Sequence, residues 1–72
     1  MKFVLIEWVD SNFHHGWDSE IPELAYCVTA GILVNKCKES ISVAIAQSNN
    51  GNMANCMIIP RKCITSIKEL KL

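Results

Sequence analysis

The stretch MIIPRKCITSIKEL, residues 57–70, decides the fold, because it begins as an apolar run and changes character at Pro60. Proline cannot donate a ladder hydrogen bond, so a strand is expected to end there. Beyond it, Ile64, Ile67 and Leu70 recur every three residues, which fits a helix but also a short strand after one turn of 3₁₀ helix. We favour the 3₁₀ turn and a strand, because a curled four-stranded sheet would otherwise leave an edge uncovered.

Runs of strand length precede this tail, and turn residues separate them. The expected strands cover residues 3–9, 25–34, 41–46 and 54–59, and the connections cover 11–24, 35–40 and 47–52. The first connection is a long loop, and Asn50-Gly51 in the last one suits a positive φ. Gly31 inside the second strand predicts a bulge or sharp bend that lets the sheet curl.

Alternation predicts which side chains share a face in two of these strands. One face of the second strand is expected to carry Tyr26, Val28, Ala30, Ile32 and Val34. One face of the third is expected to carry Ile41, Val43 and Ile45.

These elements predict an all-β fold, a small five-stranded SH3-like barrel formed by one domain, residues 1–72. The features that indicate this barrel are the long first loop and the 3₁₀ turn before the last strand. The alternative is an antiparallel sheet with a C-terminal helix. A chain of 72 residues of which 50% are apolar buries a modest share of its surface, so we expect a homo-oligomer.

Four short motifs carry a resemblance: W-x-D-S (Trp8, Asp10, Ser11), G-W (Gly16, Trp17), G-x-L-V (Gly31, Leu33, Val34) and I-P-R-x-x-I (Ile59, Pro60, Arg61, Ile64). With them, most of the chain resembles short proteins of unknown function encoded by phages and prophages. The resemblance implies a small β-barrel and a viral origin, and it implies no activity. Some phage proteins of this size sequester nucleotide second messengers of bacterial immunity, such as the CBASS cyclic dinucleotides, an analogy from size and origin.

The charge is balanced overall but unevenly spread. The formal net charge is zero, so no overall field favours a nucleic acid or a membrane surface. Residues 1–24 hold five acids and one base, whereas residues 25–72 hold six bases and two acids. This asymmetry predicts either two parts that face each other or a basic patch beside the C-terminal segment.

The cysteine pattern and the hydropathy indicate a soluble, reduced protein of the cytoplasm, or of the host cytoplasm for a phage protein. The four cysteines form no C-x-x-C pair, which argues against zinc ribbons and thioredoxin-like motifs. Three of them lie in apolar runs, and we expect all four thiols to be unreactive. No secretory signal is visible, and no apolar run reaches the roughly 18 residues of a membrane helix.

The stretch DSNFHHGWD, residues 10–18, has a structural and a functional interpretation. Structurally, Asp10 and Ser11 accept backbone hydrogen bonds, Gly16 permits a turn, and Trp17 covers one end of the core. Functionally, the first loop and the 3₁₀ turn of an SH3-like barrel border one groove. A nucleotide base would stack on the indole there while basic side chains hold its phosphate. The candidate ligand-binding residues are Ser11, His15, Trp17, Asn49, Asn50, Arg61 and Lys62.

Metal and catalytic sites are disfavoured. His14 and His15 are adjacent, so their side chains would point to opposite sides of a strand. The sequence shows no spacing that indicates a third metal ligand, so we expect no metal and no cofactor. We expect a non-enzymatic barrel that sequesters a small anion as a homo-oligomer, with a nucleotide immune signal as the expected ligand. The alternative is a module that inhibits or adapts a host protein, with Trp17 and Tyr26 as anchors. Nucleic-acid binding ranks third.

Overall fold

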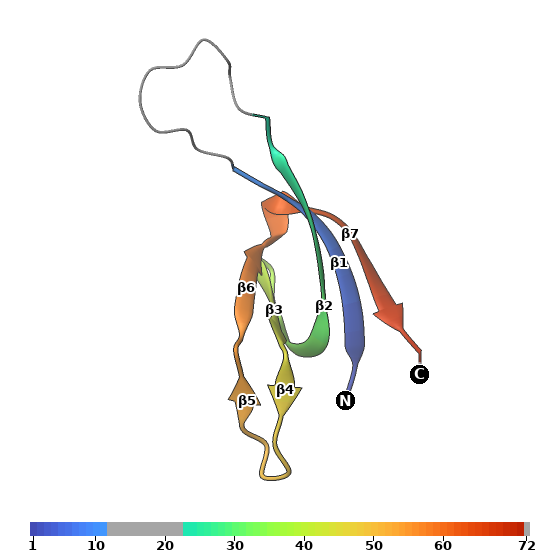
Figure 1. The fold of residues 1–72 in the computed structure, drawn as a ribbon, viewed down its shortest axis with the longest axis vertical. Coiled ribbons are helices and arrows are strands. Elements are labelled where there is room, and N and C mark those ends of the chain that lie inside the picture. Colours follow the sequence, from blue (N-terminus) through green and yellow to red (C-terminus); the bar gives the residue numbers. More distant parts are fainter. Residues whose placement is uncertain (12–22, 72) are drawn as a thin grey trace.

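The computed structural model describes residues 1–11 and 23–71, and this part of the chain is built almost entirely from antiparallel strands (Figure 1). Five strands form one sheet in the order β6-β3-β2-β1-β7, and two short strands, β4 and β5, form a separate ribbon. A single 3₁₀ turn, η1, precedes the last strand. The elements are β1 (Phe3–Asp10), β2 (Ala25–Lys36), β3 (Ser40–Ala44), β4 (Ala46–Gln47), β5 (Met53–Ala54), β6 (Met57–Pro60), η1 (Arg61–Cys63) and β7 (Ile64–Leu70).

The tail folds as predicted, and the alternative with a C-terminal helix is wrong. Pro60 is the last residue of β6, Arg61–Cys63 form η1, and β7 then pairs antiparallel with β1. Ile67 lies opposite Ile6, and Ile64 lies opposite Trp8. Strand pairing therefore explains the apolar residues of the tail, since a bulge between these two pairs brings both isoleucines to the core face.

The predicted barrel is confirmed only as an all-β fold. In the described part of the chain, β6 and β7 are the two edges of the sheet and form no ladder with each other, so the sheet is not closed. The predicted third and fourth strands are each divided in two. The break between β3 and β4 falls at Ile45, and Asn55, with a φ of 53°, lies between β5 and β6.

The core lies on the concave face of the curled sheet. Its buried residues come from three strands: Val4, Ile6, Ile41, Val43 and Ile59. Trp8, Leu33, Ile64 and Ile67 pack against them. The indole N–H of Trp8 donates a hydrogen bond to the Thr29 hydroxyl at 2.9 Å, so the ring is held within the fold.

The structure confirms the shared face of Tyr26 and Val28 in the second strand and corrects the face predicted for the third strand. Tyr26 and Val28 do lie on one face of β2, but it is the outer face, where they are 82% and 65% exposed. The concave face of this strand carries smaller residues, including Thr29 and Gly31, opposite Ile6 and Val4. Ile45 was expected beside Ile41 and Val43 but is 73% exposed, because the strand breaks at that residue.

The predicted irregularity in β2 is present, but Gly31 is not its position. The register shifts between Leu33 and Asn35, which makes Val34 the extra residue of a bulge. Glycine is required at position 31 for a different reason, because a Cβ atom there would lie 2.7 Å from the carbonyl oxygen of Ala44 on β3. The glycine thus permits the close approach of two backbones where β2 passes from pairing with β1 to pairing with β3.

Candidate functional site

Three cationic side chains gather around η1. A cavity of about 450 Å³ is lined by Lys38 and Glu39 from the β2–β3 turn and by Pro60, Arg61 and Lys62. We call this cavity the basic turn pocket. Its volume lies within the range of about 300–1,000 Å³ found for small-molecule sites.

The antiparallel pairing of β3 with β6 builds this pocket. Ser40 lies opposite Pro60, so the turn before β3 meets the turn after β6. Two hydrogen bonds fix the junction: the Arg61 amide donates to the Glu39 carbonyl at 2.8 Å, and Arg61 Nε donates to the Cys37 carbonyl at 3.1 Å. The guanidinium is thereby oriented by the backbone of the neighbouring turn, while Lys38 and Lys62 are exposed.

The pocket carries an excess of positive charge. It holds three cations and one carboxylate, and no carboxylate of residues 1–11 and 23–71 forms an ion pair with any of the three cations. Guanidinium and ammonium groups that lack a fixed counter-ion attract phosphate and carboxylate groups. Chemically, this arrangement suits the binding of a small anion.

The sequence prediction placed seven residues in one groove, and the structure brings two of them together in this pocket. Arg61 and Lys62 both line it. Ser11 follows the end of β1, a strand that contacts η1, and its amide donates to the Asp10 carboxylate at 2.8 Å. His15 and Trp17 lie outside the described residues, as do His14 and Gly16.

Asn49 and Asn50 are not brought to the basic turn pocket. They lie in the tip that joins β4 to β5, which is separated from η1 by the lengths of β5 and β6 (Figure 1). There the Ser48 hydroxyl donates to the Asn50 side-chain oxygen, the Asn52 amide donates to the Ser48 hydroxyl at 3.2 Å, and Gly51 has a φ of 88°. Asn50 therefore stabilises a tight turn, the role that the Asn-Gly pair predicted for this segment.

Cys37 is the residue that bears on the expectation that all four thiols are unreactive. Its thiol is exposed, and a hydrogen bond with the Ser40 hydroxyl at 3.4 Å, followed by hydrogen bonds with the backbone of Glu39 and Ser40, lowers the pKa of the Cys37 thiol. The residue also lies between Lys36 and Lys38, and its carbonyl holds Arg61. The lowering comes from hydrogen bonds within the turn at residues 37–40, contacts that the sequence alone does not show.

Neither a metal-binding cluster nor a membrane-spanning helix is present in the described part of the chain. Residues 1–11 and 23–71 contain no group of three His, Cys, Asp or Glu side chains able to hold a metal ion. None of the helical structure in the same residues is long and apolar enough to cross a membrane.

Comparisons with known proteins give no match: no family model fits the chain, and no curated protein and no solved structure is significantly similar.

Proposed function

We propose that this protein binds a small phosphate-bearing anion in the basic turn pocket, without catalysing a reaction. The observation that supports this is the convergence of Lys38, Arg61 and Lys62 on one cavity of about 450 Å³. Nucleotide signals are the ligand class that fits best, since they combine phosphates with a planar base. In a phage setting, such binding would sequester an immune signal.

The roles of the cations follow from their chemistry. Arg61 uses Nε for the Cys37 carbonyl, and its two terminal nitrogens then present parallel donors to a phosphate. Lys38 and Lys62 supply mobile ammonium groups that adapt to a second phosphate or to the other oxygens of the first. Stacking of the base on Trp17 remains part of the proposal, and that residue lies outside the described part of the chain.

We also propose that the chain belongs to the SH3-like class and assembles as a homo-oligomer. The order β6-β3-β2-β1-β7, with η1 joining the two edge strands, supports the first point. Exposed apolar side chains on the outer face, Tyr26 and Val28 on β2 and Ile58 on β6, support the second. Covering them would remove apolar surface from water.

A second candidate function is a protein-interaction module directed at a host protein. Tyr26 favours it, because this side chain is 82% exposed and lies opposite Val9 on the outer face. Exposed tyrosines with apolar neighbours are common anchors in protein interfaces.

Native mass spectrometry of the protein with cyclic dinucleotides and trinucleotides tests the proposed function. We expect an oligomer that gains an integral nucleotide mass, and a loss of affinity of about tenfold or more in Arg61→Gln and Lys62→Gln. Lys71→Gln is the matched control, because it removes one positive charge near the C-terminus, away from η1 (Figure 1).

An oligomer that gains no mass with any nucleotide of the panel would overturn the proposed nucleotide binding. The protein-interaction function would then be favoured. An equal loss of affinity in Lys71→Gln would show that the overall charge, and not the basic turn pocket, attracts the ligand.

A further inference from the structure

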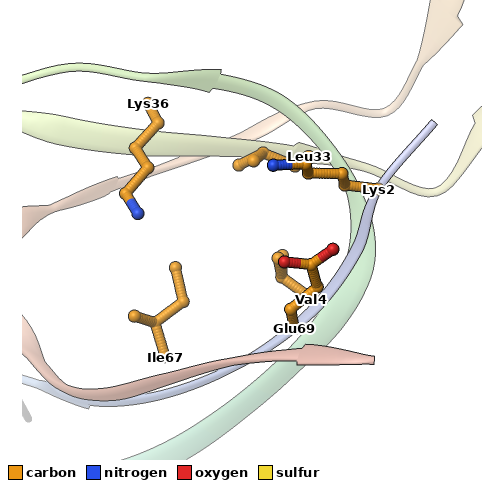
Figure 2. A pocket seen from close by; sticks show the side chains of 6 residues that line it. All are labelled: Lys2, Val4, Leu33, Lys36, Ile67 and Glu69. Atoms are coloured by element: carbon orange, nitrogen blue, oxygen red, sulfur yellow. The ribbon is translucent and has the colours of Figure 1, made fainter. Parts of the chain in front are cut away.

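A second, smaller cavity lies in the curl of the sheet, separate from the basic turn pocket. Its volume is about 170 Å³, and Figure 2 shows its lining: Lys2, Val4, Leu33, Lys36, Ile67 and Glu69. We call it the concave pocket. It is smaller than the ~300 Å³ at the lower end of the range for drug-sized ligands, so only a small molecule fits it and a nucleotide does not.

The bulge at Val34 directs Lys36 toward this pocket. Before the bulge, Leu33 pairs with Val43, and after it, Lys36 pairs with Ile41. Both partners are core residues, so Leu33 and Lys36 share the concave face although three positions separate them. In a regular strand this spacing would place them on opposite faces, and the ammonium group would point to the outside.

The register of β7 places a carboxylate on the same face. Glu69 lies opposite Val4, a buried core residue, whereas its neighbour Lys68 lies opposite Leu5 on the outer face. The third charged residue is positioned by its backbone, since the Lys2 carbonyl accepts a hydrogen bond from the Leu33 amide at 2.8 Å.

The lining thus combines two ammonium groups, one carboxylate and an apolar floor. The floor consists of Val4, Leu33 and Ile67. Although the charges are opposite, the carboxylate forms no ion pair with either lysine in the described structure. Figure 2 shows the Lys36 side chain extending from β2 into the pocket, toward Ile67.

We propose that the concave pocket binds a small aliphatic zwitterion, of the class of aliphatic α-amino acids. The ligand carboxylate would meet the ammonium groups of Lys2 and Lys36, and its own ammonium group would meet Glu69. Its aliphatic part would cover the apolar floor. This matches each charged group with an opposite one, whereas a simple anion would leave Glu69 beside a negative charge.

The experiment is an NMR titration of the ¹⁵N-labelled full chain with three related compounds. The first is L-leucine, the second is 4-methylpentanoate, which lacks the ammonium group, and the third is 3-methylbutylamine, which lacks the carboxylate. We expect saturable shifts of the amide signals of Leu33, Lys36 and Ile67 with leucine, and affinities lower by about tenfold for the other two. No saturable shift with leucine, or equal affinity for 4-methylpentanoate, would overturn the proposal.

Two variants assign the roles of the charges. Glu69→Gln is expected to lower the affinity for leucine about tenfold and to leave the affinity for 4-methylpentanoate unchanged. Lys36→Gln is expected to lower the affinity for both ligands. Lys68→Gln and Glu7→Gln are matched controls, since both residues lie on the outer face. If the control variants lower the affinity for leucine equally, general charge effects explain the binding and the proposed binding in the concave pocket is wrong.

The spectra of the variants report folding directly, so a loss of binding through unfolding is recognised. The result is also independent of nucleotide binding, because that ligand would shift the signals of Lys38 and Lys62 instead.

Discussion

Replacing Gly31 with alanine tests the closest backbone approach in the sheet. A methyl group at this position would lie 2.7 Å from the Ala44 carbonyl oxygen. Ala44 is buried and pairs with Ile32, so the sheet holds this oxygen in place and it cannot turn aside like a flexible side chain. Relief requires the backbones of β2 and β3 to separate locally.

Two opposing contributions decide the sign of the effect. Alanine restricts the unfolded chain more than glycine, which by itself would stabilise the protein by about 0.4–1 kcal/mol. Overpacking at a fixed position costs about 1–3 kcal/mol. The expected result is a net loss of about 1–2 kcal/mol, which for a chain of this size lowers Tm by about 5–15 °C.

Thermal and urea unfolding followed by circular dichroism measure this loss. Ala30→Val is the matched control, because it adds apolar atoms at the adjacent, exposed position of the same strand, and it is expected to change the free energy of unfolding by less than about 0.5 kcal/mol. A Gly31→Ala protein that melts at or above the wild-type temperature would refute the close approach of β2 and β3.

Three further predictions concern other parts of the molecule. Ile59→Ala, at a side chain that is 1% exposed, is expected to lower the free energy of unfolding by about 2–5 kcal/mol in a urea titration, and a loss below about 1 kcal/mol would contradict its place in the core. Because the pKa of Cys37 is lowered, its thiolate persists to lower pH, so Ellman's reagent should modify it before the exposed Cys56, and Ser40→Ala should slow the reaction; equal rates would argue against this. Tyr26→Ser is expected to weaken self-association in sedimentation velocity with little effect on Tm, and an unchanged oligomer would exclude the outer face of β2 as the interface.

Local signals were sufficient for much of the fold. Pro60 ends β6 because proline has no amide hydrogen to donate, and that property is visible in one residue. The 3₁₀ turn and the last strand needed a non-local argument, because the local spacing of the isoleucines fitted a helix as well and only the uncovered edge of a four-stranded sheet favoured a strand. Alternation in β2 correctly grouped Tyr26 with Val28, but period alone does not say which face is buried, since the small residues Thr29 and Gly31 occupy the concave face.

The candidate sites depended on contacts that no local pattern contains. Arg61 meets the turn at residues 37–39 only because β3 pairs with β6, and Lys36 faces the concave pocket only because Val34 is an extra residue. Neither the pairing partner nor the position of a bulge follows from hydrophobic periodicity. The lowered pKa of the Cys37 thiol likewise depends on the folded turn, because its hydrogen bonds come from Ser40 and from the backbone of Glu39 and Ser40.

The ribbon of β4 and β5 is expected to open independently of the five-stranded sheet, because it forms a separate sheet. Its strands form no ladder with the main sheet in the described structure, and its four ladder residues are joined to that sheet at Ile45, whose amide donates to the Ala54 carbonyl at 3.1 Å, and at residues 55–56. Two-stranded ribbons are marginally stable in water, so its amide protons should exchange long before those of the core. A Cβ atom added at Gly51 would have no atom within 4 Å, but its φ of 88° favours glycine, so this exposed tip is a permissive place for inserting an epitope or a fluorophore-binding peptide that leaves Gly51 itself in place.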